Sequence, residues 1–238
     1  MHHKLITCSA AALLASAVAF IAVPSAVATS SKSTDVTVRI EGLNKTILAS
    51  GTYAVPKTGY ITHDGAPTGK CPADSAAGAL NAATHGKWSG TWSSSYDDYE
   101  VFRIDRVYEN YETSNAYWGL YVNNVSASTG VCGVTPLKSG EQIMFAAIPD
   151  SAAGYALAIK APASVKAGHV FKIKVVYYNA KGVAVPLADA LVKGSGGSAK
   201  TNKFGTAEVV VHRPGYITLN VSAKGYVRAS TVTVLVRR

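Results

Sequence analysis

The stretch NAYWGLYVNNVSASTGVCG, residues 115–133, decides how the first half of the chain is expected to fold. Its residues alternate between two faces, which is typical of a β-strand. The adjacent Asn123 and Asn124 predict a turn, and the residues after them a short returning strand. We expect a hairpin with one core face and one exposed face that stacks on a ligand. The core face holds Trp118, Leu120 and Val122, and the exposed face holds Tyr117, Gly119 and Tyr121.

Aromatic residues are dense between positions 88 and 121. Aromatic side chains at such density either build a hydrophobic core or line a surface that stacks on the ring of a ligand or sugar. The sequence leaves both interpretations open. The residues that we predict to contact a ligand are Trp88, Trp92, Tyr117, Tyr121, Asn123 and Asn124.

The start of the chain is predicted to be a secretory signal peptide, residues 1–28. Lys4 precedes the apolar run 5–23, and Ala26-Val27-Ala28 has the small residues that signal peptidase accepts. The alternative is an uncleaved membrane anchor. We expect cleavage, a secreted chain that begins at Thr29, and no membrane span after that cleavage.

Two cysteines remain in the mature chain, Cys71 and Cys132. An even number of cysteines in an exported protein predicts a disulfide. This bond would close a loop of 61 residues. The alternatives are two free thiols or a metal site, and no pair of histidines lies near enough in sequence to favour the metal.

Residues 29–150 are expected to form one α+β domain. In STDVTVRIEGL, Val36, Val38 and Ile40 share one face of a half-buried strand. In PADSAAGALNAATHG, residues 72–86, Asp74 or Ser75 can begin a helix and Gly86 can end it. One helix among several strands indicates the α+β class.

Residues 151–238 are expected to form a second domain, a β-sandwich of immunoglobulin type. Short strands such as HVFKIKVVYY and GYITLNVSAKGY alternate with Gly, Pro and Lys-Gly turns, and no helix pattern is present.

Positive charge is concentrated in this second half. Residues 29–150 hold 9 Lys and Arg against 12 Asp and Glu, whereas residues 151–238 hold 13 against 2. Such a basic region outside the cell attracts anionic polymers such as wall phosphates, acidic glycans or DNA. The alternative is that the charge serves solubility alone.

Catalytic constellations are not recognised in the sequence. Its histidines have no metal-ligand spacing, and no serine lies in G-x-S-x-G. Asp97, Asp98 and Glu100 are close enough in sequence to suggest a glycosidase pair or a calcium site, and the alternative is a solvated acidic loop. We expect no enzymatic activity, no cofactor and no metal.

CPADSAAGALNAATHGKWSGTW and AYWGLYVNNVSASTGVCGVTPLKSGEQIMF resemble the secreted DUF4430 family. That family is similar to the C-terminal domain of transcobalamin and intrinsic factor. The resemblance covers residues 35–148 and implies a β-grasp-related fold with a hairpin at Asn123-Asn124. It also implies a bridge between Cys71 and Cys132.

The second half resembles bacterial Ig-like or carboxypeptidase-regulatory-like modules, through TNKFGTAEVVV and PGYITLNVSAKGY. The pairing of the two parts behind a signal peptide is similar to exported actinobacterial proteins.

Taken together, these patterns predict an exported, non-catalytic binding or adhesion protein of the bacterial cell envelope. Its basic half would bind an anionic envelope polymer, with no specific nucleic acid as partner. One alternative is a secreted protein that binds a small aromatic or corrinoid-like ligand on the first half. Another is a cell-wall hydrolase.

Overall fold

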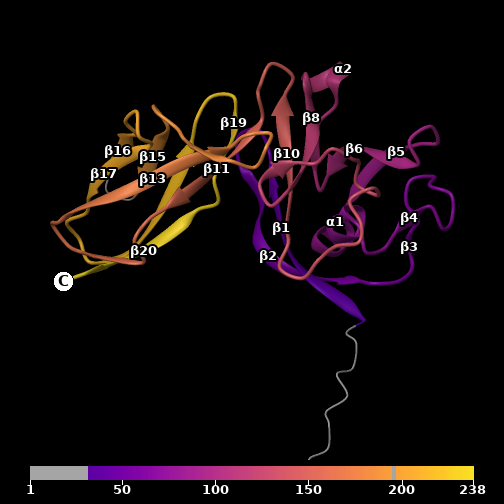
Figure 1. Ribbon diagram of the computed structural model, residues 1–238, viewed down its shortest axis with the longest axis horizontal. Coiled ribbons are helices and arrows are strands. Elements are labelled where there is room, and N and C mark those ends of the chain that lie inside the picture. Colours follow the sequence, from indigo (N-terminus) through magenta and orange to yellow (C-terminus); the bar gives the residue numbers. More distant parts are fainter. Residues whose placement is uncertain (1–31, 195–196) are drawn as a thin grey trace, which may run out of the picture. The chain divides into compact units, whose positions relative to one another are not determined.

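The structure is a computed structural model that describes residues 32–194 and 197–238. The predicted signal peptide, residues 1–28, lies outside the described residues. The described residues form one compact unit (Figure 1).

The first half is built on a mixed five-stranded sheet in the order β2-β1-β10-β8-β9. Strands β1 and β10 run parallel, and the other neighbours run antiparallel. Val36, Val38 and Ile40 of β1 are fully buried on one face, as their alternation predicts. The strands are β1 (Ser33–Glu41), β2 (Thr46–Pro56), β8 (Ala116–Val122), β9 (Val125–Ser126) and β10 (Gln142–Pro149).

Helix α1 (Ala76–Thr84) packs against this sheet. Ser75 caps its start by accepting a hydrogen bond from the Gly78 N–H, and His85 ends it in the left-handed conformation. A β-carbon built on Gly78 would lie 1.8 Å from the Ala73 carbonyl oxygen, so only glycine allows this close approach. The predicted Ser75 cap is confirmed.

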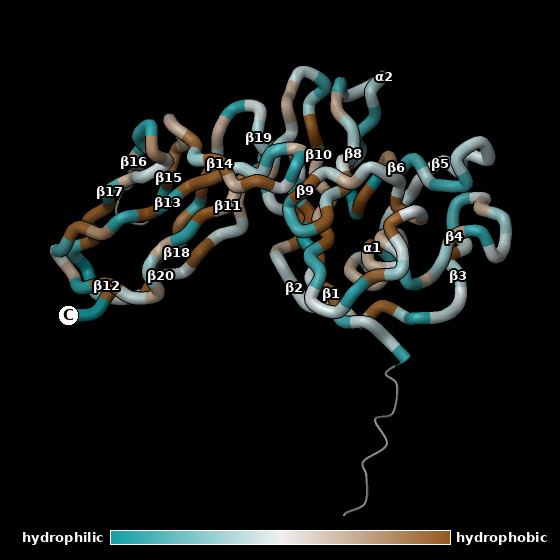
Figure 2. Tube along the Cα trace, in the orientation of Figure 1, coloured by the Kyte–Doolittle hydropathy of each residue, from teal (hydrophilic) through white to brown (hydrophobic). Residues whose placement is uncertain are grey.

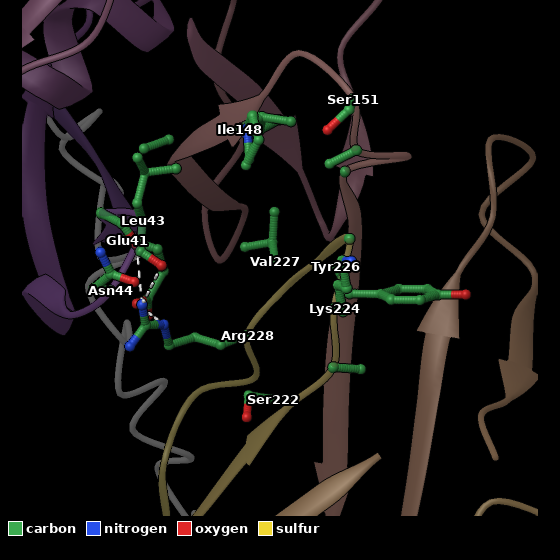
Figure 3. A pocket seen from close by; sticks show the side chains of 17 residues that line it. Glu41, Leu43, Asn44, Ile148, Ser151, Ser222, Lys224, Tyr226, Val227 and Arg228 are labelled. Carbon is green, nitrogen blue, oxygen red and sulfur yellow. Dashed lines mark hydrogen bonds and ion pairs between the residues drawn. The ribbon is translucent and has the colours of Figure 1, made fainter. Parts of the chain in front are cut away.

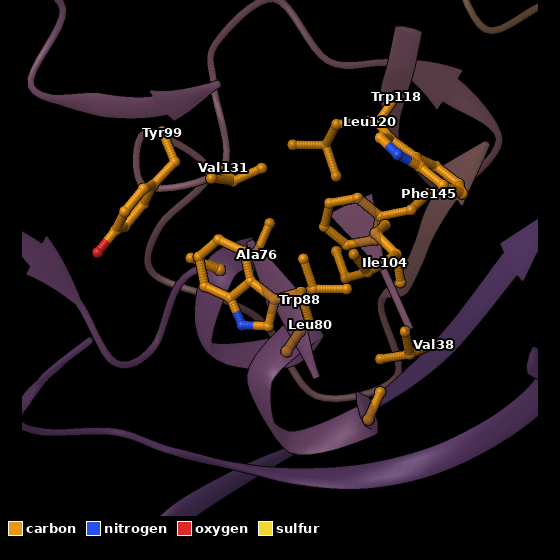
Figure 4. Packing of buried hydrophobic residues seen from close by; sticks show 14 of the residues in the cluster. Val38, Ala76, Leu80, Trp88, Tyr99, Ile104, Trp118, Leu120, Val131 and Phe145 are labelled. Atoms are coloured by element: carbon orange, nitrogen blue, oxygen red, sulfur yellow. The ribbon is translucent and has the colours of Figure 1, made fainter. Parts of the chain in front are cut away.

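Short elements enclose the far side of the helix. They are β3 (Tyr60–Ile61), β4 (Cys71–Pro72), β5 (Trp88–Ser93), β6 (Asp98–Ile104), β7 (Val107–Tyr108) and α2 (Tyr111–Ser114). Strands β5, β6 and β7 form a three-stranded sheet. The core between α1 and the sheets contains Leu80, Trp88, Ile104, Trp118 and Phe145 (Figure 4).

The second half consists of two five-stranded sheets around one core. Figure 2 shows hydrophobic residues gathered along its strands, for example β13. One sheet contains β11 (Tyr155–Lys160), β13 (Val170–Tyr178), β14 (Ala184–Pro186), β17 (Thr206–Val210) and β19 (Tyr226–Val227). The other contains β12 (Ser164–Lys166), β15 (Leu191–Gly194), β16 (Gly197–Lys200), β18 (Gly215–Ser222) and β20 (Val232–Arg237).

The predicted α+β class is wrong, because the described chain is mainly β. Strands hold 52% of its residues and helices 6%. The sequence pattern in 72–86 is real, but it yields a helix of only nine residues, and α2 has four. Two short helices do not form a layer of their own, so the packing is dominated by sheets.

The junction between the halves buries charge. Arg39 is 6% exposed and Glu41 is 2% exposed, although alternation placed Arg39 on the uncovered face of its strand. Arg39 donates to Glu41 at 3.3 Å and to the Arg228 carbonyl at 3.0 Å. Arg228 in turn forms an ion pair with Glu41 at 3.3 Å (Figure 3). We call Arg39, Glu41 and Arg228 the charge cluster.

Burial has the largest effect on the pKa values of Arg39 and Glu41 in this cluster. It lowers the pKa of Arg39 and raises the pKa of Glu41, because removal from water disfavours both charged forms. The mutual attraction of the charges opposes both shifts. The second half thus covers the outer face of β1, which is why Arg39 is not exposed.

An apolar cluster lies beside these charges. Its buried members are Tyr121, Met144, Ala146, Ile148, Ala156 and Val227, drawn from both halves of the chain. The Tyr121 hydroxyl donates to the Gly154 carbonyl in the connection between the halves. The boundary expected at residue 150 therefore falls within a packed region rather than in an open linker.

The predicted disulfide is confirmed, because Cys71 and Cys132 are bonded. It joins β4, just before α1, to the loop that follows β9, and both cysteines are buried. Replacing both cysteines by serine should lower the free energy of unfolding by about 4 kcal/mol, because the unfolded chain regains the freedom of a long loop. Urea unfolding measures this loss.

Chemical reduction provides the control for this change. A reductant should destabilise the natural chain by a similar amount and leave the double variant unaffected. Equal stability of the natural chain and the variant would contradict the prediction.

Glu41→Gln should destabilise the fold by about 3 kcal/mol, because it leaves two arginines close together without a counter-charge. Glutamine keeps the acceptor for the Thr46 hydroxyl, so charge is the main change. Urea unfolding with Glu208→Gln as the matched control checks this, since Glu208 forms an exposed pair with Lys172. Similar small losses for both variants would show that the cluster contributes little.

Candidate functional site

The predicted ligand-contact residues do not form one surface. Trp88 is 1% exposed and Tyr121 is 2% exposed. Trp88 packs among α1 and the sheet strands, with Tyr99 edge-on at 5.1 Å (Figure 4). The predicted exposed face of β8 is wrong for Tyr121, because the second half covers it. Burial also raises the pKa of its hydroxyl.

Trp92 extends this aromatic packing. Its ring meets Tyr99 edge-on at 5.1 Å, and its side chain is partly buried against the core. Among the described residues its indole N–H has no hydrogen-bond partner. Trp88, Tyr99 and Trp92 thus form a continuous packed series.

Asn123 and Asn124 form the tip of the predicted hairpin. Their φ angles are 51° and 68°, which asparagine tolerates and which suit a two-residue turn between antiparallel strands. The Asn123 side-chain oxygen accepts a hydrogen bond from the Gln142 N–H at 3.0 Å. Both residues therefore serve the turn, and Asn123 also holds the neighbouring strand.

The acidic loop is held by local contacts. The Asp98 carboxylate accepts hydrogen bonds from the N–H groups of Tyr99, Cys132 and Gly133. Asp97 pairs with Lys70 at 3.4 Å. A β-carbon on Gly130 would lie 2.5 Å from the Asp98 carboxylate carbon, so the loop closes tightly on this acid. Within residues 32–194 and 197–238, no three His, Cys, Asp or Glu side chains gather as metal ligands.

A cavity with a volume of about 450 Å³ lies at the junction of the halves (Figure 3). Its charged side chains are Glu41, Arg228 and the exposed Lys224. Glu41 accepts hydrogen bonds from Thr46 and Arg39, and Arg228 donates to the carbonyls of Gly42 and Leu43. Glu41 and Arg228 are thus already paired, whereas Lys224 has no ion pair or hydrogen bond from its side chain among the described residues.

A smaller cavity of about 310 Å³ lies between β6 and β8. We call it the aromatic groove. Strand β6 contributes Tyr99, Glu100 and Phe102, and strand β8 contributes Tyr117 and Trp118. The segment between β7 and β8 contributes Glu109 and Tyr111.

Glu109 is the most unusual residue of the groove. It is 5% exposed. Its backbone N–H donates to the Phe102 carbonyl at 2.8 Å, yet among the described residues its carboxylate has no hydrogen bond or ion pair. The carboxylate oxygens are not fully enclosed, so they remain accessible from the groove. Such a group at a cavity wall indicates a site for an external partner.

Two tyrosines stack at the groove. The rings of Tyr111 and Tyr117 lie 5.1 Å apart at an interplanar angle of 14°. Burial raises the pKa of Tyr111, and Tyr117, Asp150 and Glu100 raise it further. Trp118 also lines the groove, and its buried indole N–H has no partner among the described residues.

Sequence reasoning found part of this groove. Tyr117 was among the predicted contact residues, and Glu100 was in the hydrolase alternative. Glu109 and Tyr111 were missed, because the segment VYENYETS shows only polar and aromatic residues in a connection. The one available signal was an acid flanked by tyrosines.

No family model matches this chain, and a search of curated proteins finds no match either. The resemblance to DUF4430 and to Ig-like modules therefore stays a prediction. Across the described part of the chain, no helix is long and apolar enough to cross a membrane.

Proposed function

We propose that the chain is an exported, non-catalytic binding protein whose ligand occupies the aromatic groove. The observation that carries this proposal is that Glu109, whose carboxylate has no partner among the described residues, lines the same groove as the stacked Tyr111 and Tyr117. Stacked rings provide a flat apolar contact, and the carboxylate provides a directed polar one, which are the usual components of a small-molecule site. The Cys71–Cys132 bond supports export.

The volume of the groove bears on the kind of ligand. About 310 Å³ is near the lower end of the range for small-molecule pockets. It suits a single ring with a short substituent better than a corrinoid macrocycle. The hydrolase alternative is also less favoured, because Asp97 and Asp98 are engaged by Lys70 and by backbone N–H groups.

If the ligand binds in the groove, removing the rings of Tyr111 and Tyr117 should weaken binding. The double variant Tyr111→Ala/Tyr117→Ala should lose binding to purified bacterial cell envelope at least tenfold in a sedimentation assay. Tyr96→Ala is the matched control, because Tyr96 is exposed, belongs to the same half and does not line the groove. Unchanged binding by the double variant would refute the groove as the binding site.

The same incubation tests catalysis. Release of soluble sugar or peptide from the envelope by the natural chain, and not by a heat-unfolded sample, would favour the hydrolase alternative. We expect no release.

Association with an anionic envelope polymer is proposed for the second half. Lys160 of β11 lies opposite Lys174 of β13, and Lys172 lies on the same face of β13. All three are exposed, and among the described residues the one carboxylate paired with them is Glu208, 3.8 Å from Lys172. Like charges directly opposite each other destabilise a sheet, which supports an anionic partner for this lysine face.

Replacing Lys160, Lys172 and Lys174 by glutamine should weaken envelope binding at low salt and remove most of its salt dependence, because exposed charges are screened. The control replaces three exposed lysines of the first half, Lys45, Lys57 and Lys138, and so makes the same change in net charge. Equal losses for the two variants would show that net charge, and not this face, drives the association.

A further inference from the structure

We infer that the ligand of the aromatic groove is a small organic ammonium ion: a protonated amine carried on a ring. This inference rests on the proposed function and adds the chemical class of the ligand. It follows from the charges, the rings and the size of the groove.

The charged side chains described in the wall of the groove are all negative. Glu100 and Glu109 line it, and no Lys, Arg or His is among the described residues that form its wall. The negative charge of Asp150 also contributes to the raised pKa of Tyr111. Carboxylates without a neighbouring cation favour a ligand that brings the cation, since opposite charges attract strongly where water is partly excluded.

Glu109 sets where the ammonium group lies. The residue is 5% exposed, and its carboxylate lines the groove and accepts no hydrogen bond from the described residues. A protonated amine carries up to three N–H donors, so it supplies both the missing hydrogen bond and the missing charge. A neutral hydroxyl supplies only the hydrogen bond.

The rings suit the same ion. Tyr111 and Tyr117 are parallel within 14°, and Trp118 also lines the groove. The faces of tyrosine and tryptophan rings attract cations and also stack on the body of a ring-bearing ligand. The groove thus has two features that stabilise a cation, its carboxylates and its ring faces, and no cationic side chain among its described residues.

Two sources of the ligand share this chemistry: an arylalkylamine and an amino sugar. The test is isothermal titration of the full mature chain with matched probes. Benzylamine, benzyl alcohol and benzoate have similar shapes and differ in charge, and glucosamine and glucose make the same comparison for a sugar. We expect each amine to bind at least tenfold more tightly than its neutral partner, and benzoate not to bind. The amine that binds more tightly identifies the source.

Glu109→Gln should abolish the preference for the amine over the neutral probe. Glu112→Gln is the matched control, because Glu112 is exposed on α2 and does not line the groove. The Glu109 variant is expected to fold, since it exchanges an unpaired buried charge for a neutral amide, and its melting temperature should equal or exceed that of the natural chain. The indole N–H resonance of Trp118 should shift on addition of amine in the natural chain only.

Equal binding of amine and neutral probes, or an amine preference that survives Glu109→Gln, would overturn the inference. Tight binding of glucose or benzyl alcohol would do so while leaving the proposed function intact. Failure of every probe would also overturn it, and the envelope assay with Tyr111→Ala/Tyr117→Ala then decides separately whether the groove binds anything.

Discussion

The burial of Arg39, Glu41 and Arg228 is the constraint on which the arrangement of the rest depends. Removing three charged groups from water costs free energy that only close mutual pairing offsets. Two of them belong to β1 and the third follows β19, so the pairing holds the two halves in contact. It also leaves β1 buried on both faces at its end. The nearby Tyr121 is covered by the same contact, which turns an expected ligand platform into part of the packed junction.

The junction cavity and the aromatic groove differ in whether their charged side chains already pair with other protein groups. At the junction, the Glu41 carboxylate and the Arg228 guanidinium already satisfy one another, and Lys224 is the charged lining side chain without a partner among the described residues. In the aromatic groove, the Glu109 carboxylate has no partner among the described residues. Volume alone would favour the junction, whereas the chemistry of the walls favours the groove. Unsatisfied buried polar groups are rare in folded proteins, and for that reason they are the better guide to a site.

Local patterns in the sequence predicted local structure well. The alternation of Val36, Val38 and Ile40 identified β1 and its buried face, and Ser75 identified the start of α1. The Asn123-Asn124 pair identified a hairpin, since few residues adopt positive φ at two successive positions. The predicted α+β class was wrong, because it assumed that one helical pattern would form a separate layer of helices. A short helix among many strands does not change how sheets pack.

The sequence by itself determined where strands turn, which side chains are apolar, and that Cys71 and Cys132 were available to pair. These properties depend on neighbours within a few residues or on composition. Only the tertiary structure decided which faces are covered and which polar groups find partners. Arg39 is buried by residues nearly two hundred positions away, and Glu109 lines the same groove as Tyr99 and Phe145 only because separate strands enclose it. Burial and pairing are set by long-range contacts, which no local pattern encodes.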